Sequence, residues 1–182
     1  MTILAELHRD HLNLNRLLDI LRAKIDKLHS GTRPNFRLLA DAIGYIGDYA
    51  DRHHHVREER MLAYFSNRDA ELDELVQQCG VQHHQLQALS HDLSDAIDSI
   101  LNDTLMPMDQ FIDKLETYVL EQKAHLDFEE KHLFPRLDQV ATEADWRTLG
   151  GQLPQNLDPL FGEHQSEEYV ELYRDLLQDV KR

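Results

Sequence analysis

The chain has 182 residues and a net charge of −15, from 19 lysines and arginines against 34 aspartates and glutamates. A chain this acidic repels phosphate backbones and anionic lipid surfaces, which argues against nucleic-acid binding and membrane binding. Hydrophobic residues make up 41% of the chain, enough for the core of one domain, while a single cysteine excludes an internal disulfide and sites built from several cysteines.

The first half of the chain predicts two helices. Residues 2–28 carry leucine and isoleucine at spacings of three and four, which is typical of an amphipathic helix. The segment Ser30-Gly31-Thr32-Arg33-Pro34 ends that helix, and Pro34 suits the first turn of a second helix over residues 34–65.

The second half predicts two more helices before residue 140. A polar turn at residues 66–69 leads into a helix over residues 70–101, with a candidate break at Cys79-Gly80. A further turn at residues 102–107 precedes a helix that ends near Val140. No segment sustains the alternation that a β-strand requires.

These segments predict an all-α protein with two parts. Four long helices joined by short turns favour an up-down-up-down four-helix bundle over residues 1–140. Residues 141–182 contain Gly150-Gly151, Pro154 and Pro159, followed by an amphipathic helix near residues 163–180. This part is too short to bury a core of its own, so we expect a C-terminal helical extension packed on the bundle.

A motif occurs twice in the chain. HHVREERML ends at Leu62 and HLDFEEKHL ends at Leu133, and both contain the pattern H-x-x-x-E-E-x-x-L. Residues four apart lie on one face of a helix, so the histidine and the first glutamate of each motif can reach one site. A glutamate on an apolar stripe needs a compensating charge, which a metal ion supplies. The predicted ligands are His54, Glu58, His125 and Glu129.

The other two helices each offer one histidine to the same site. His11 lies on the leucine stripe of the first helix, and 43 residues separate it from His54. His83 precedes His125 by 42 residues, and aligning His83 with His11 also aligns three pairs of leucines. The adjacent His84 does not give these matches, so we predict that His83 faces inward and His84 does not.

Neighbouring residues are given other roles. We expect His53 and His55 to be solvated, and Glu59 and Glu130 to form salt bridges or to support the ligands. Tyr118 and Glu121 precede His125 on its face, where either could support a ligand, and core packing is the expectation for Tyr118. Gly47 leaves two alternatives open: room for a small-ligand channel, or close packing of helices. The His164/Glu168 pair is expected to be a chance match.

Four imidazoles and two carboxylates from four helices suit two divalent ions, bridged by the carboxylates. The full predicted set is His11, His54, Glu58, His83, His125 and Glu129. Imidazole and carboxylate donors favour iron first and manganese or zinc next. A ferritin-like oxidase would need Glu-x-x-His on two helices, and the chain offers only Glu129/His132.

The segments LHRDH, HHVREE, VQHH and HLDFEEKHLFP resemble the hemerythrin-like (HHE cation-binding) domain over about residues 1–140. The resemblance implies a non-haem di-iron centre inside a four-helix bundle, bridged by a carboxylate from each motif and by an oxygen species. Oxygen-carrying members have an H-x-x-x-H pair on the third helix, where this chain has Gln87 four residues after His83. Its ligand set is more similar to that of bacterial members that repair iron–sulfur centres and respond to nitric oxide.

The resemblance implies a protein that binds or reacts with O2, NO or peroxide, or that handles iron under stress. The alternative is a structural or zinc-type metal site in a helical module that binds a partner. We expect a cytoplasmic protein, because the single cysteine fits a reducing compartment and the first residues lack the basic and apolar regions of a signal peptide. Whether the protein is an enzyme is left open.

Overall fold

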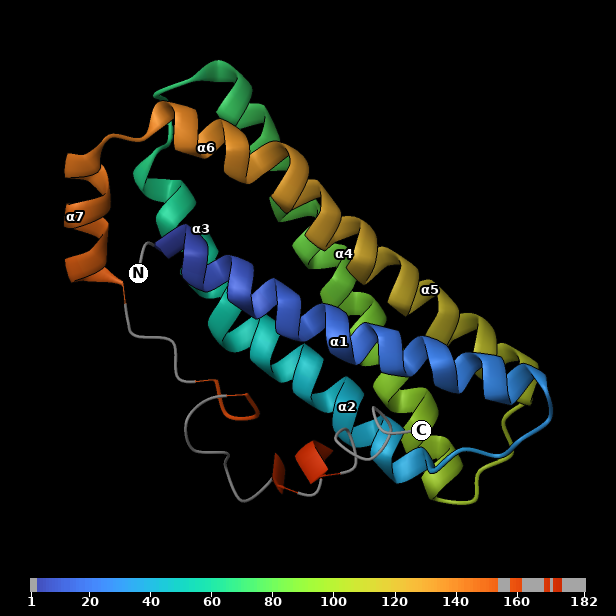
Figure 1. Ribbon diagram of the computed structural model, residues 1–182. Helices are drawn as coiled ribbons and strands as arrows, with labels where there is room; N and C mark the ends of the chain where they lie inside the picture. The colour runs from blue at the N-terminus through green and yellow to red at the C-terminus, as the bar shows by residue number, and fades with distance from the viewer. Residues whose placement is uncertain (1–2, 154–157, 162–168, 171, 175–182) are drawn as a thin grey trace.

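The computed structural model describes residues 3–153, 158–161, 169–170 and 172–174. All regular structure within these ranges is helical, as predicted. The long helices lie side by side as an elongated bundle, with α7 at one end (Figure 1). The predicted 163–180 helix lies mostly outside the described residues.

Two of the four predicted helices are uninterrupted. Helix α1 covers Ile3–His29 and helix α4 covers Ala70–Leu101, so the candidate break at Cys79-Gly80 is wrong. Gly80 costs helix propensity, but the interior of a helix with 32 residues tolerates it. Asp69 caps the first turn of α4 by accepting a hydrogen bond from the Leu72 amide at 2.9 Å.

The other two predicted helices each contain a π-helical segment. The first comprises α2 (Phe36–Tyr49), η1 (Ala50–His54) and α3 (His55–Tyr64). It begins two residues later than predicted, because Asn35 caps it and accepts hydrogen bonds from the Arg37 and Leu38 amides. The second comprises α5 (Met108–Phe128), η2 (Glu129–Leu133) and α6 (Phe134–Val140).

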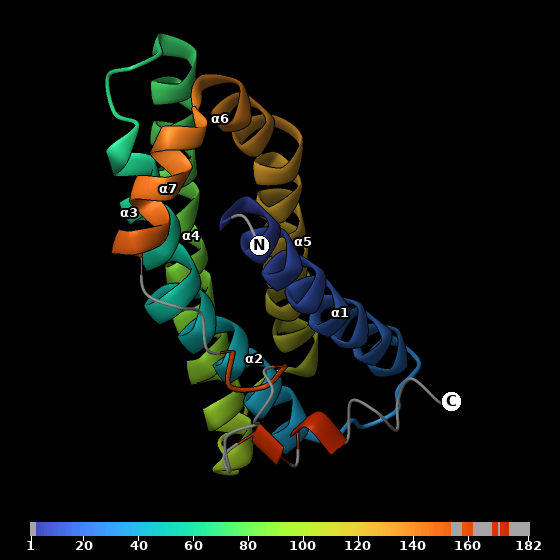
Figure 2. The ribbon, with the colours of Figure 1, turned by 60° about the vertical axis from the view of Figure 1, so that its left-hand side comes forward.

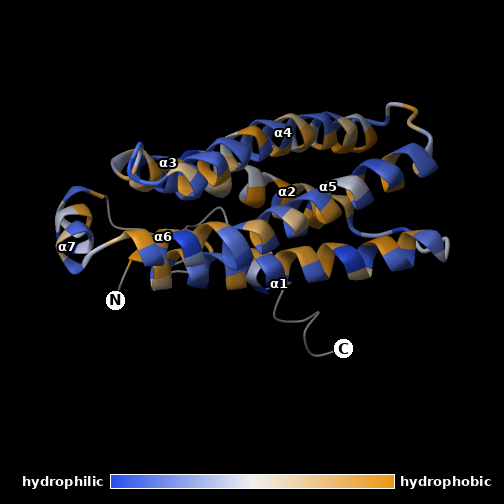
Figure 3. Cartoon of the chain, turned by 90° about the horizontal axis from the view of Figure 1, so that it is seen from above, coloured by the Kyte–Doolittle hydropathy of each residue, from blue (hydrophilic) through white to orange (hydrophobic). Residues whose placement is uncertain are grey.

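The helices contact one another in a closed ring. Helix α1 packs against α2 and α5, and α4 packs against the same two helices from the other side. Figure 2, turned from the first view, shows α2 beside α4 and α1 beside α5. Each long helix carries apolar and polar residues along its whole length, as an amphipathic helix does (Figure 3).

The apolar core is divided into two clusters along the bundle. One contains Leu14, Ile46 and Leu126 among many others. The other lies toward the α7 end and contains Leu7, Met61 and Leu133. Each long helical segment therefore contributes apolar residues to both clusters and buried polar residues between them.

Residues after Val140 contact both clusters. Helix α7 (Glu143–Gln152) begins with a capping box between Thr142 and Asp145 and contributes Leu149 to the second cluster. Leu160 belongs to the first cluster, and the Tyr45 hydroxyl donates a hydrogen bond to Asp158 at 2.8 Å. The division between a bundle and an extension at residue 140 stays a prediction.

Candidate metal centre

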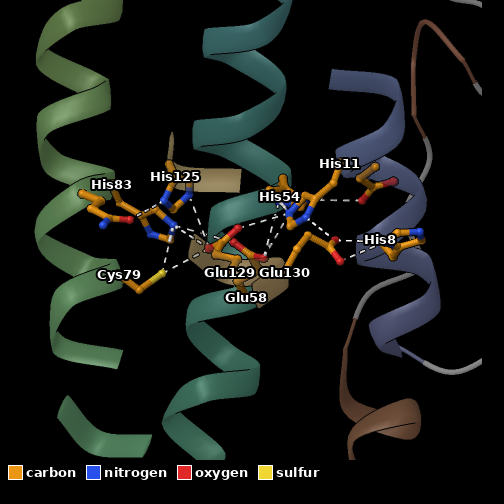
Figure 4. A network of polar contacts seen from close by, with 11 residues as sticks. His8, His11, His54, Glu58, Cys79, His83, His125, Glu129 and Glu130 are labelled. Carbon is orange, nitrogen blue, oxygen red and sulfur yellow. Dashed lines mark hydrogen bonds and ion pairs between the residues drawn. The ribbon is translucent and has the colours of Figure 1, made fainter. Parts of the chain in front are cut away.

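A layer of buried polar side chains lies between the two apolar clusters. Figure 4 shows the polar contacts within it. Each of these side chains belongs to a residue that is at most 6% exposed. They come from α1, η1, α3, α4, α5 and η2. The layer contains His11, His54, His55, Glu58, His83, His125 and Glu129.

The two π-helical segments lie at this layer. His54 ends η1, four residues before Glu58, and Glu129 begins η2, four residues after His125. In a straight α-helix, four residues turn about 40° more than a full circle, because a turn takes 3.6 residues. Residues spaced four apart therefore move gradually around the helix, away from the core. A π-helical turn takes more residues and cancels this rotation. The π turn of η1 keeps Ile46, Ala50, His54, Glu58 and Leu62, all four residues apart, buried on one side.

Four imidazoles point the same nitrogen, Nε2, toward the centre of the layer. Their Nδ1 atoms point outward, and three of them face hydrogen-bond acceptors. His11 Nδ1 lies 2.7 Å from Glu130 Oε1, His125 Nδ1 lies 2.9 Å from Gln82 Oε1, and His54 Nδ1 lies 3.4 Å from Asp10 Oδ2. His83 Nδ1 makes no hydrogen bond among the described residues and lies 3.7 Å from Glu59 Oε1. The three outer acceptors favour a hydrogen on Nδ1, which leaves Nε2 as the inward nitrogen that can bind a metal.

The two glutamates lie between two pairs of imidazoles. Glu58 Oε1 lies 3.5 Å from His54 Nε2 and 3.7 Å from His11 Nε2, while Glu58 Oε2 lies 3.7 Å from His83 Nε2. Glu129 has the same arrangement. Its Oε2 lies 3.2 Å from His11 Nε2, and its Oε1 lies 3.3 Å from His125 Nε2 and 3.6 Å from His83 Nε2. Each carboxylate thus presents one oxygen to each imidazole pair.

The electrostatics differ between the imidazoles. Burial lowers the pKa of His54 to about 4 and that of His125 to about 3, so both are neutral at pH 7. Burial also opposes charge on His11 and His83, but the neighbouring glutamates outweigh it and raise the pKa of both imidazoles. Burial opposes the charge on Glu129, yet the imidazoles around it, His125 foremost, hold its pKa well below the usual range.

Glu58 shows that these residues fit a metal ion. Its side chain is fully buried, and neither carboxylate oxygen finds a hydrogen-bond partner among the described residues. A buried carboxylate without hydrogen bonds is costly, and imidazole nitrogens at 3.5–3.7 Å offset that cost only in part. A divalent cation placed between Glu58 and the inward nitrogens removes that cost, and imidazole with carboxylate is a donor set for iron, manganese or zinc.

The structure brings together all six residues that the sequence predicted as ligands. His83 is 6% exposed and belongs to the layer, whereas His84 is exposed. His53 is also exposed, as expected. Glu130 contacts His11 and also His8, at 3.0 Å from the His8 Nδ1 atom. The His164/Glu168 pair lies outside the described residues.

His55 corrects one expectation. It was expected to be solvated, but it is 5% exposed and its ring stacks on that of His83, with centroids 3.9 Å apart and planes inclined by 17°. The expectation treated the chain as a regular helix, in which residues one apart point about 100° away from each other. The η1 segment ends at His54 and widens the helix there, so both His54 and His55 are buried.

Cys79 is a member of the layer that the sequence reasoning missed. Its Sγ lies 3.2 Å from Glu129 Oε1 and 3.4 Å from His83 Nε2, and the residue is 1% exposed. The sequence feature that indicates its place is the spacing of four residues between Cys79 and His83, which puts both on one face of the helix. A lone cysteine in a sequence indicates only that an internal disulfide and a site built from several cysteines are excluded.

The two residues on α5 differ from each other. Tyr118 belongs to the first apolar cluster, in line with the expected core packing, whereas Glu121 is exposed. Gln122 is the buried residue one turn before His125. Glu121 is about 40° from His125 around the helix axis on one side, and Gln122 is about 60° from it on the other. The buried face of α5 includes His125 and Gln122 and leaves Glu121 in solvent.

Gly47 lies where α2 and α4 approach closely. A Cβ atom at this position would be 2.5 Å from Ser90 Oγ. Gly47 also lines a cavity of about 390 Å³ between these helices, and none of the six predicted ligands is among the residues that line it. The geometry favours close packing over a channel to the ligands.

The chain resembles one known family over most of its length. The Hemerythrin HHE cation binding domain matches residues 2–137. No curated protein matches the chain. Among the described residues, no helix combines the length and the apolar character that a membrane span requires.

Proposed function

The chain belongs to the hemerythrin HHE cation-binding family, and we propose that its buried layer holds two iron ions that bind or react with O2, NO or peroxide. His11 and His54 would hold one ion, and His83 and His125 the other. Glu58 and Glu129 would bridge them.

The arrangement of the two carboxylates carries this proposal. Glu58 and Glu129 each direct one oxygen to the His11 side and the other to the His83 side, at 3.2–3.7 Å from inward nitrogens. A carboxylate that serves a single ion has no need to face two imidazole pairs. Two carboxylates with this orientation support a two-ion site, in which each carboxylate would give one oxygen to each ion.

The family also supports a finer account of the fold. We propose that α1, the α2–α3 segment, α4 and the α5–α6 segment form an up-down-up-down bundle over residues 1–140. Residues 141–182 would form an extension packed on it. Each of the four segments then contributes at least one ligand, and the layer is fixed by the packing of the apolar clusters on both sides.

The residues of the layer prepare the site for a small ligand. Each ion would receive two imidazole nitrogens and one oxygen from each carboxylate, which leaves two of six octahedral positions for exogenous ligands. The outer acceptors Glu130, Asp10 and Gln82 keep the inward nitrogens aligned. The apolar clusters on either side exclude bulk water and bulky ligands. Iron supplies the one-electron chemistry when bound.

Spectroscopy of the loaded protein tests this function. Protein loaded with ferrous iron under argon is exposed to NO or to O2, and we expect its absorption spectrum to change within seconds. Zinc-loaded protein is the matched control, because zinc has no redox chemistry and should give no response. An iron-loaded spectrum that neither gas changes would contradict the proposal and favour a structural metal site.

A further inference from the structure

One sulfur atom lies at the half of the layer formed by His83 and His125. Cys79 is on α4, one turn before His83, and its Sγ lies 3.4 Å from His83 Nε2. The thiol donates a hydrogen bond to Glu129 Oε1 at 3.2 Å. Figure 4 shows its side chain pointing toward the same carboxylate as those of His83 and His125.

A second observation points to a ligand at this position. His125 Nε2 is buried, finds no hydrogen-bond partner among the described residues and lies 3.3 Å from the same Glu129 oxygen. His83 Nε2 lies 3.6 Å from that oxygen. A sulfur, two imidazole nitrogens and a carboxylate oxygen therefore converge on one small region, and sulfur with imidazole is a donor set that zinc, iron and copper accept.

We propose that Cys79 binds, as a thiolate, the metal ion held by His83 and His125. The inference rests on the proposed function, because it adds a ligand to one half of the same centre. When the ion binds, the sulfur–hydrogen bond is replaced by a sulfur–metal bond, and the proton passes to the solvent. The hydrogen bond to Glu129 holds the sulfur beside the carboxylate before the ion arrives.

His55 is near enough to this half to be a rival ligand, but its direction is wrong. The lone pair of an imidazole nitrogen lies in the plane of the ring. The rings of His55 and His83 are stacked, with planes inclined by only 17°. An ion in the plane of the His83 ring therefore lies well above the plane of the His55 ring. His55 packs on His83 and fixes its orientation, while Cys79 supplies the additional donor.

This ligand makes the two halves of the centre unequal. The half with His11 and His54 has four protein donors, counting one oxygen from each glutamate, whereas the half with His83, His125 and Cys79 has five. With six octahedral positions for each ion, the first half has more room for an exogenous ligand. Small ligands should therefore bind at the His11 side.

X-ray absorption of zinc-loaded protein tests the sulfur ligand. A zinc–sulfur bond is about 2.3 Å long, against about 2.0–2.1 Å for bonds to nitrogen and oxygen. The wild-type protein should show the longer shell, with about half a sulfur per zinc when both sites are full. Cys79→Ser should bind zinc and lose that shell. Met61→Leu, which removes a buried thioether on α3, should keep it.

Each outcome bears on a separate claim. Wild-type protein that binds zinc through nitrogen and oxygen alone would overturn the role of Cys79 and leave the metal centre intact. Wild-type protein that binds no zinc or iron would overturn the proposed function as well. Failure of Cys79→Ser to fold would not obscure the test. A sulfur shell at about 2.3 Å in both wild type and Met61→Leu identifies a thiolate ligand, and Cys79 is the one cysteine of the chain.

Discussion

His11 Nε2 and His54 Nε2 lie 2.9 Å apart, and both residues are 1% exposed. Two neutral nitrogens at this distance repel, so one of them must donate a proton to the other. Two imidazoles bound at right angles to one ion, with bonds of about 2.1 Å, place their nitrogens about 3.0 Å apart. The proton between His11 and His54 therefore holds the two rings in nearly the spacing that an ion requires.

Metal loading should release protons. The adjacent glutamates raise the pKa of His11 well above its usual value, so this imidazole carries an extra proton at pH 7 in the absence of metal, whereas His54 and His125 are neutral. The pKa of His83 is raised as well. An ion displaces the proton of His11, so zinc added at pH 7 in a weakly buffered indicator solution should release at least about one proton per chain. Zinc binding without proton release would contradict this assignment.

The pKa shifts of these four histidines predict how the metal-free protein titrates and how its stability depends on pH. His11 and His83 contribute stability below the unfolded pKa of 6.5, and that contribution is lost as pH rises through their folded pKa. His54 and His125 act in the opposite sense. Their folded pKa is about 4 and about 3, so they reduce stability as pH falls below 6.5. NMR should show two histidines titrating above 6.5 and two that remain neutral down to about 4.

The adjacent histidines on α4 should behave differently. His83→Ala removes a nitrogen from the buried layer and should reduce iron bound from about two ions per chain toward one. His84→Ala is the matched control, because His84 is exposed and should leave metal content unchanged. Elemental analysis after anaerobic loading measures both. Loss of metal in His84→Ala alone would mean that the inward face of α4 has been misassigned.

Glu130 should matter for metal affinity although it does not enter the layer. Its Oε1 accepts from His11 Nδ1 at 2.7 Å and keeps Nε2 turned inward. Removal of such an outer partner usually weakens metal binding about 10–100-fold. Glu130→Ala should show this loss in competition with a chelator, and Glu121→Ala, at an exposed position of α5, should show none. Equal affinities would argue that packing alone orients His11.

Gly47 and Gly44 form a test of helix packing. An added Cβ at Gly47 would meet Ser90 Oγ at 2.5 Å, so the Ser90 hydroxyl must rotate away in Gly47→Ala. Gly44 has no atom within 4 Å of an added Cβ, so Gly44→Ala should raise the free energy of unfolding by about 0.5–1 kcal/mol. Gly47→Ala should raise it by less than Gly44→Ala, and Ser90→Ala combined with Gly47→Ala should remove the difference. Chemical denaturation measures all three, and equal gains for the two single variants would contradict the contact.

The repeated motif made much of the site predictable. The pattern H-x-x-x-E-E pointed to Glu58 and Glu129, and the leucine register of the third helix separated His83 from His84. Helix type and helix ends followed from spacing and turn residues. In each case the signal lay in residues close together in the chain, where helix geometry fixes their relation.

The remaining features depended on departures from a regular helix or on contacts between helices. The steps of four residues from Ile46 to Leu62 indicate an under-wound segment, but a reading at 100° per residue placed His55 in solvent. Cys79 gains its meaning from Glu129, which comes from another helix and lies 50 residues away. The outer acceptors Asp10 and Gln82 could not be paired with their imidazoles before the helices were packed together.

Metal stoichiometry tests the central claim most directly. Protein loaded with ferrous iron under argon and freed of excess iron should contain about two ions per chain. Glu58→Gln and Glu129→Gln should each fall well below that value, because each glutamate serves both halves of the layer. A tight stoichiometry of one ion per chain, unchanged by either substitution, would contradict a carboxylate-bridged pair of ions.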